Sequence, residues 1–159
     1  RSDRLVLPGV GEARSAMTAL ERLGLAEWLR STTKPYLGIC LGMQILFERS
    51  EERNTPGLGI LEGTVRRFNG GSIKVPHIGW NSVEADPGHP LFAGIPAGSW
   101  FYFVHSYDGP CGPHAIGRTT HGVEFASAVR YRNFTGVQFH AEKSGRDGLT
   151  LLRNFVTSC

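Results

Sequence analysis

The chain has 159 residues, of which 40% are hydrophobic and 19% charged, and its formal net charge is +3 at pH 7. These values fit one soluble globular domain and exclude a disordered chain. No apolar run reaches the roughly 18 residues of a membrane span, and the basic residues are dispersed, so we expect neither a membrane nor a nucleic acid as a partner.

The cysteines are too few and too scattered for a disulfide framework. Cys40, Cys111 and Cys159 are the three, and no pair has the spacing of a metal site. The sequence starts directly before an apolar run, so no signal peptide is predicted. We therefore expect a cytoplasmic, reducing setting and neither a metal nor another cofactor.

The first third of the chain alternates between short apolar runs and helical patterns. Residues 4–7 form an apolar run that predicts a buried strand. Residues 11–30 repeat apolar side chains every three or four positions, which predicts a helix broken at Gly24. Residues 36–39 are a second predicted strand and residues 41–48 a second helix. This alternation predicts a parallel sheet.

The rest of the chain is predicted to be richer in strands. Residues 51–59 are predicted to be a loop, and residues 86–98, which hold three prolines, a series of turns. The predicted strands are residues 63–68 and 80–85, as an antiparallel insertion, and residues 99–107, 122–131 and 134–139. A closing amphipathic helix covers residues 146–156. We expect a single domain over residues 1–159, an α/β fold in three layers with a mixed sheet flanked by helices.

The strongest chemical signal is the sequence Gly38-Ile39-Cys40-Leu41-Gly42. A predicted strand ends, a cysteine follows between two glycines, and a helix begins, which is the pattern of a nucleophile elbow. Such a turn places the sulfur at a helix N-terminus, where we expect a thiolate to be favoured. The backbone N–H of Leu41 would serve as an oxyanion donor. The alternative is a buried structural cysteine.

A cysteine nucleophile needs a base, and His140 is the best placed of the six histidines. It follows a predicted strand, and Glu142 lies two residues further, on the same side of an extended segment. The carboxylate of Glu142 could orient the imidazole of His140 by accepting its second N–H, as in a Cys-His-Glu triad. Among the others, His77 and His105 are less well placed, and three are expected at the surface: His89, His114 and His121. A glycine-rich turn, Leu7-Pro8-Gly9-Val10-Gly11, ends the first strand and should face the same crevice.

Three motifs together resemble class I (triad) glutamine amidotransferases. They are Pro8-Gly9-Val10-Gly11, the stretch from Gly38 to Gln44, and Gly136-Val137-Gln138-Phe139-His140-Ala141-Glu142-Lys143-Ser144. Their order and separation match over nearly the whole chain. Two further stretches look like signatures of the glutaminase subunits of imidazole glycerol phosphate synthase, a histidine-biosynthesis enzyme: Lys74-Val75-Pro76-His77-Ile78-Gly79-Trp80-Asn81 and Tyr102-Phe103-Val104-His105-Ser106-Tyr107.

The resemblance implies a role for each matching residue. Cys40 would attack the side-chain amide of L-glutamine and form a thioester, His140 would move protons, and Glu142 would hold His140. The backbone N–H groups of Val10 and Leu41 would bind the oxyanion. The positions that would hold glutamine are Gly11, Gln44, Glu52, Ser106 and Tyr107.

The resemblance also implies a partner. Ammonia would pass to a (β/α)8-barrel cyclase subunit in a heterodimer, which makes imidazole glycerol phosphate and AICAR. The residues that match the partner-facing surface are Pro76, His77, Ile78, Trp80 and Lys143. The family usually has Pro at the position of Ala141. It also has a strand–helix–strand unit before the segment that matches here, so we expect an N-terminally truncated domain with an exposed sheet edge.

Two other classes of function stay open. One is a non-catalytic binding or scaffold protein on the same fold, and the other is a different cysteine hydrolase, such as a peptidase. A scaffold would need none of Cys40, His140 and Glu142. Gln44 and the stretch at residues 76–81 argue against another hydrolase.

Overall fold

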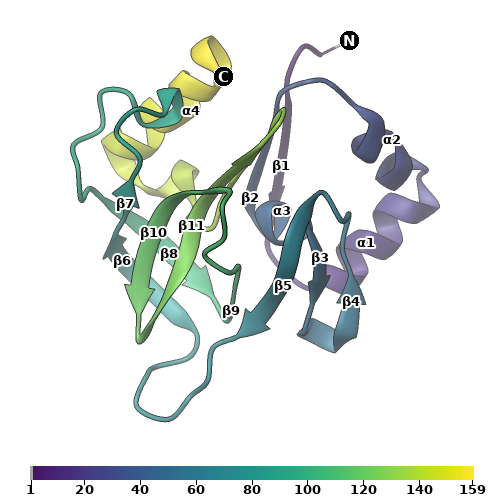
Figure 1. Ribbon diagram of the computed structural model, residues 1–159, viewed down its shortest axis with the longest axis horizontal. Helices are drawn as coiled ribbons and strands as arrows, with labels where there is room; N and C mark the ends of the chain where they lie inside the picture. The colour runs from purple at the N-terminus through teal and green to yellow at the C-terminus, as the bar shows by residue number, and fades with distance from the viewer. Residues whose placement is uncertain (1) are drawn as a thin grey trace.

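A six-stranded mixed sheet forms the middle of the fold (Figure 1). The computed structural model describes residues 2–159. The strand order is β1 (Leu5–Gly9), β2 (Tyr36–Cys40), β12 (Phe134–Val137), β11 (Val123–Tyr131), β10 (Ala115–His121) and β7 (Glu84–Ala85). The first three strands are parallel and the others antiparallel. Every residue of β2 is buried, as expected for a central parallel strand covered on both faces.

The two faces of this sheet carry separate hydrophobic clusters, because successive side chains of β2 point to opposite sides. Tyr36 belongs to a cluster with α1 (Ala13–Arg22) and α2 (Leu25–Ser31), whereas Leu37 packs with α4 (Gly145–Ser158). Figure 1 shows α1 and α2 on one side of the sheet and α4 on the other. The predicted three-layer α/β architecture is therefore confirmed.

Two smaller sheets complete the layers. One has the order β4 (Thr55–Pro56), β3 (Phe47–Ser50), β5 (Leu61–Arg67) and β9 (Tyr107–Asp108). The other pairs β6 (His77–Ser82) with β8 (Trp100–His105). Short 3₁₀ turns cover residues Glu52–Asn54, Pro90–Phe92 and Ala141–Lys143. No helix in residues 2–159 is long and apolar enough to cross a membrane.

The structure corrects several predicted elements. The helix expected over residues 41–48 is only the single turn α3 (Leu41–Gln44). The chain then enters β3, because the carbonyls of Ile45 and Leu46 accept hydrogen bonds from Leu58, Ile60 and Leu61. This run is buried on all sides, a pattern that does not separate strand from helix.

The predicted antiparallel insertion is also wrong. Strand β5 pairs with β3 and β9 and not with the strand that follows it. The strand expected over residues 80–85 divides into β6, which starts earlier, and β7, which joins the edge of the main sheet. Strand β10 was not predicted. Within the described residues β1 pairs only with β2, so it forms the opposite edge of that sheet.

Candidate active site

Cys40 lies at a sharp turn between β2 and α3. Its backbone has φ 54° and ψ −106°, a conformation that L-residues rarely adopt. The flanking glycines are needed sterically. A Cβ on Gly38 would lie 2.2 Å from the carbonyl oxygen of Gly42, and a Cβ on Gly42 would lie 1.9 Å from that of Leu7. The structure therefore forms the nucleophile elbow that the sequence predicts, with strained backbone at the cysteine.

The sulfur of Cys40 is buried among polar groups. The side-chain amide of Gln138 donates from Nε2 to Sγ over 3.5 Å, and the carbonyl oxygen of Val104 lies 3.9 Å from Sγ. Burial raises the pKa of Cys40 to about 11, although the backbone N–H of Leu41 lowers it. The expectation of a favoured thiolate is thus wrong, because desolvation of the sulfur outweighs the N–H donor at the N-terminus of the single helical turn. A thiol at this position needs a base.

His140 and Glu142 form the expected pair. Nδ1 of His140 lies 2.6 Å from Oε1 of Glu142, and the imidazole is almost fully buried. Glu142 approaches from the 3₁₀ turn Ala141–Lys143 and not from an extended segment. Nε2 of His140 is buried and has no hydrogen-bond partner among the described residues. That nitrogen is free to exchange a proton with a reacting group.

The sheet register brings this pair to the end of the sheet where Cys40 lies. Strands β2 and β12 are parallel neighbours, with Ile39 opposite Val137, so the residues that follow both strands emerge at one edge. The negative charge of Glu142 acts on Cys40 and raises its pKa. The backbone of His140 is held by Tyr102, whose carbonyl accepts from its N–H over 2.9 Å.

A cavity of about 270 Å³ opens beside Cys40. Its lining combines the elbow, the glycine-rich turn and the end of β8: Val10, Gly11, Cys40, Leu41, Gln44, Glu52, Val104, His105, Ser106 and Tyr107. All the residues that the sequence assigns to the oxyanion and to glutamine binding therefore meet in one cavity. The carboxylate of Glu52 is fixed by the N–H of Ala13, which donates to Oε2 over 2.8 Å.

Sequence reasoning assigned no role to Gln138, and it judged His105 less well placed. Gln138 is completely buried and accepts from Nε2 of Gln44 at 3.0 Å while it donates to Cys40. His105 is buried at the wall of the cavity. The available signal was a polar side chain inside an apolar strand, since a buried amide or imidazole is retained only with hydrogen-bond partners.

Side chains of β6 alternate between the two faces of the strand, so only some of the residues assigned to a partner-facing surface are exposed. Ile78 and Trp80 are 56% and 51% exposed, whereas His77 is only 5% exposed. The side chain of His77 therefore does not meet the expectation that it faces a partner. Lys143 is exposed and Pro76 partly so. His121, expected at the surface, is partly exposed and stacks on His77 with ring centroids 4.1 Å apart.

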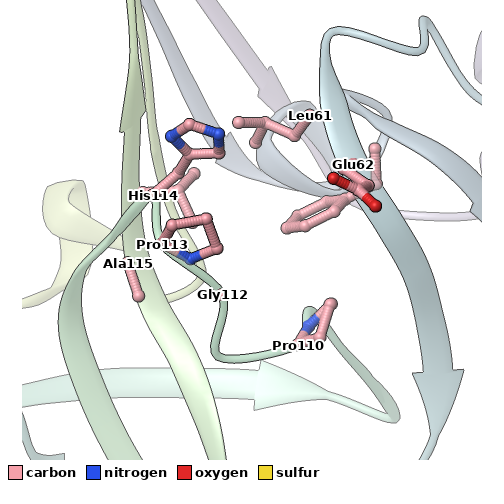
Figure 2. A pocket seen from close by; sticks show the side chains of 9 residues that line it. Leu61, Glu62, Pro110, Gly112, Pro113, His114 and Ala115 are labelled. Carbon is pink, nitrogen blue, oxygen red and sulfur yellow. The ribbon is translucent and has the colours of Figure 1, made fainter.

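A second cavity, of about 260 Å³, lies between β5 and the loop before β10 (Figure 2). Figure 2 shows mainly apolar side chains around it, with the carboxylate of Glu62 and the imidazole of His114 as its titratable groups. It shares no lining residue with the cavity at Cys40. The elbow cavity is therefore the candidate active site.

Comparison with known proteins identifies the family. Residues 2–159 match the family described as glutamine amidotransferase class-I. The chain is 46% identical to the imidazole glycerol phosphate synthase subunit HisH of Pasteurella multocida, over 98% of this chain and 78% of the relative. The HisH subunits of Mannheimia succiniciproducens and Salmonella typhimurium are each 47% identical and 80% covered.

Solved structures share the fold at lower identity. A protein from Thermoplasma acidophilum, described as a putative GMP synthase subunit, superposes with a TM-score of 0.71 at 20% identity, covering 97% of this chain and 71% of that one. A structure described as a glutamine amidotransferase gives 0.71 at 19% identity, covering 98% and 80%. The chain belongs to the class I glutamine amidotransferase family and is an enzyme of that kind.

Proposed function

We propose that this chain is the glutaminase subunit of imidazole glycerol phosphate synthase, which hydrolyses L-glutamine to glutamate and ammonia for histidine biosynthesis. The names of relatives 46–47% identical over nearly the whole chain support this assignment. The observation that carries it is the position of Cys40, at a strained elbow and at the same sheet edge as the buried imidazole of His140, whose Nε2 has no partner within residues 2–159.

The first chemical step follows from the state of the sulfur. Because burial keeps Cys40 protonated, Nε2 of His140 takes the thiol proton as the sulfur attacks the amide carbon of glutamine. The tetrahedral intermediate then collapses, the C–N bond breaks, and His140 returns the proton to the leaving ammonia. A glutamyl thioester on Cys40 remains.

The second step releases glutamate. His140 removes a proton from a water molecule, which attacks the thioester carbon, and the C–S bond breaks with return of the proton to the sulfur. Glu142 accepts from Nδ1–H of His140, so it fixes the tautomer with Nε2 as the base and stabilises the imidazolium. The triad logic thus operates with Cys40, His140 and Glu142.

Negative charge develops on the carbonyl oxygen in both steps, first that of the amide and then that of the thioester. The backbone N–H groups of Leu41 and Val10 are the proposed oxyanion donors. Against the larger effect of burial, a hydrogen bond from the backbone N–H of Leu41 lowers the pKa of Cys40. Val10 lies in the same cavity lining. Gly11, Gln44, Glu52, Ser106 and Tyr107 are the proposed glutamine-binding residues.

The ammonia is proposed to reach a cyclase subunit of (β/α)8-barrel fold in a heterodimer, where it is incorporated into imidazole glycerol phosphate with release of AICAR. Ile78, Trp80 and Lys143 are the exposed residues of the proposed contact, next to partly buried Pro76. Apolar side chains as large as Trp80 are typical anchors of protein interfaces when they are left exposed on one face.

The decisive experiment measures glutamate release from glutamine with and without the cyclase and its ligand. Cys40→Ala should abolish release, whereas Cys111→Ala, at a cysteine outside the cavity, should not. A scaffold protein would release no glutamate in any combination. A different cysteine hydrolase would release no glutamate unless it accepts glutamine, and in that case it would act without the cyclase and would not be stimulated by it.

A further inference from the structure

Two buried histidines separate the active-site cavity from the exposed face of β6, and the catalytic steps above use neither. His105 is the last residue of β8 and His77 the first of β6, and the two are direct partners in the antiparallel register. Both side chains are buried. Each ring nitrogen of both histidines has a hydrogen-bond partner, so their protons can be assigned.

On the cavity side, the carbonyl of Tyr107 fixes the proton of His105. The Tyr107 carbonyl oxygen lies 2.7 Å from Nδ1 of His105, and a carbonyl can only accept, so Nδ1 carries the proton. In a neutral ring Nε2 of His105 then accepts, and Nδ1 of His77, 2.9 Å away, donates to it. His77 is left with Nε2 as an acceptor.

On the β6 side, the side chain of Asn81 also makes Nε2 of His77 an acceptor. Oδ1 of Asn81 accepts from the N–H of Ser82 at 2.8 Å, and its Nδ2 donates to the carbonyl of Thr120 at 3.0 Å, which fixes the amide orientation. The atom that faces Nε2 of His77 at 3.2 Å is therefore the donor Nδ2. Taken together, the two ends require both histidines to be neutral with the proton on Nδ1.

The surroundings keep the two rings neutral. Phe68, Phe103 and Phe125 pack around them. Burial, together with a smaller effect of the neighbouring His121, lowers the pKa of His77 to about 4 and that of His105 to about 3. Protonation would convert an accepting Nε2 into a donor facing another donor, which would break the chain of hydrogen bonds.

The chain continues from Tyr107 to the nucleophile. The Tyr107 carbonyl also accepts from Nε2 of Gln44 at 3.0 Å. Because Nε2 of Gln44 is thereby the donor, Oε1 of Gln138 accepts from it, and Nε2 of Gln138 is left facing Sγ of Cys40. One set of directed hydrogen bonds thus runs from Asn81 on β6 to the sulfur.

We propose that His105 and His77 are positioning residues for glutamine hydrolysis. His105 fixes the Tyr107 carbonyl, which in turn fixes the amides of Gln44 and Gln138 at the glutamine-binding wall, and His77 anchors His105 to β6. This inference rests on the proposed function, since it takes the cavity to hold glutamine. It also ties the substrate wall to the strand that presents Ile78 and Trp80.

Matched substitutions test the proposal in the complex with the cyclase. Asn places an amide N–H near the position of Nδ1, whereas Gln reaches the position of Nε2. His105→Asn therefore keeps the donor to Tyr107 and His105→Gln loses it, while both remove the ring from the aromatic cluster. We expect the KM of His105→Gln for glutamine to be about tenfold higher than that of His105→Asn, because His105→Gln loses one buried hydrogen bond. The two variants should have similar melting temperatures.

The same comparison at His77 extends the test. His77→Asn keeps the donor to His105, whereas His77→Gln keeps only the acceptor for Asn81, so His77→Gln should show the higher KM. His114→Gln, at the other cavity, is the control and should leave KM unchanged. Equal KM values within each Asn and Gln pair would overturn the positioning role.

An NMR measurement separates this proposal from the proposed function. In the ¹⁵N-labelled chain at neutral pH, the imidazole nitrogens of His77 and His105 should show neutral rings protonated at Nδ1. An imidazolium or an Nε2–H tautomer at either residue would overturn the chain of hydrogen bonds, whatever the enzyme does. If the rings are as expected but the wild-type complex releases no glutamate, the proposed function fails, and the positioning role fails with it.

Discussion

The indole of Trp80 lies edge-on to the ring of Tyr102, with ring centroids 6.2 Å apart. The two residues are register partners on β6 and β8, and the carbonyl of Tyr102 accepts a hydrogen bond from the N–H of His140. An exposed aromatic side chain is therefore separated from the backbone of the proposed base by a single residue. A partner that moves Trp80 would act on β8 and so on the position of His140.

This contact predicts that Trp80 couples the partner to catalysis. Trp80→Ala should weaken the stimulation of glutamine hydrolysis by the cyclase about tenfold, because an exposed Trp at an interface is a frequent energetic centre. Trp28→Ala is the matched control, since Trp28 is 43% exposed on α2, on the other side of the main sheet. Equal stimulation of both variants, measured at saturating cyclase, would contradict the coupling.

The protonated state of Cys40 predicts its reactivity. With a pKa of about 11, the thiol of the free chain should react slowly with iodoacetamide at neutral pH, and its rate should rise with pH up to that value. Alkylation of each cysteine followed by mass spectrometry gives the three rates separately. A rate for Cys40 that is already constant between pH 6 and pH 8 would show a resting thiolate instead.

The pair of His140 and Glu142 predicts unequal losses. His140→Ala should lower kcat by about 10⁴-fold, because the thiol then has no base. Glu142→Gln should cost less, about 10²-fold, since the carboxylate orients the ring and is partly exposed to water. Steady-state kinetics of the stimulated complex measure both. Losses of equal size would show that Glu142 does more than orient the imidazole.

Much of this site is readable from the sequence, because its motifs are local. The elbow at Cys40 and the pairing of His140 with Glu142 each depend on a few neighbouring residues. The protonation of Cys40 depends instead on distant groups that exclude water. The hydrogen bond from Gln138 to Cys40, 98 positions away, appears only when β12 lies beside β2.

Dependence on distant groups also explains the elements that were predicted wrongly. The run from Ile45 to Phe47 is apolar throughout, and its conformation is decided by hydrogen bonds to residues 58–61. His77 carries no local sign of burial, because its neighbours Ile78 and Trp80 are exposed and its partners lie on β8 and at Asn81. In both cases, contacts with residues outside the local sequence pattern determine the conformation or the burial.

The buried histidines predict acid sensitivity with a definite sign. The folded-state pKa values of His77 and His105, about 4 and about 3, lie below the ordinary 6.5, so the unfolded chain binds more protons below pH 6.5. Their contribution to stability is therefore present at neutral pH and is lost as the pH falls from 6.5 toward 4 for His77 and toward 3 for His105, at about 1.4 kcal/mol for each unit of pKa difference. Asp108 opposes this, because burial raises its pKa from 3.8 to about 6 and favours the folded state as pH falls.

Urea unfolding of the wild type and of a His77→Asn, His105→Asn double variant isolates the histidine contribution. The difference in free energy of unfolding should be constant above pH 7 and should shrink steadily between pH 6.5 and pH 4. Asp108 and the other carboxylates are common to both proteins and cancel in the difference. Parallel curves over that range would show that the two imidazoles do not titrate differently on folding.

The last prediction concerns the oxyanion donor at Val10. This residue lies in the cavity lining between Gly9 and Gly11, is 75% exposed, and is followed by a glycine with φ 117°. Glycines on both sides let the Gly9–Val10 peptide turn its N–H toward or away from the oxyanion. If cyclase binding selects the productive orientation, glutamine hydrolysis should be negligible in the isolated chain and strongly stimulated in the complex. Val10→Pro removes this N–H and should lower the stimulated kcat by about 10²–10³-fold, whereas Val10→Ala keeps it and should retain the stimulation. Equal kcat values for the two variants would exclude this N–H as a donor, and full activity of the wild-type chain without the cyclase would exclude the gating.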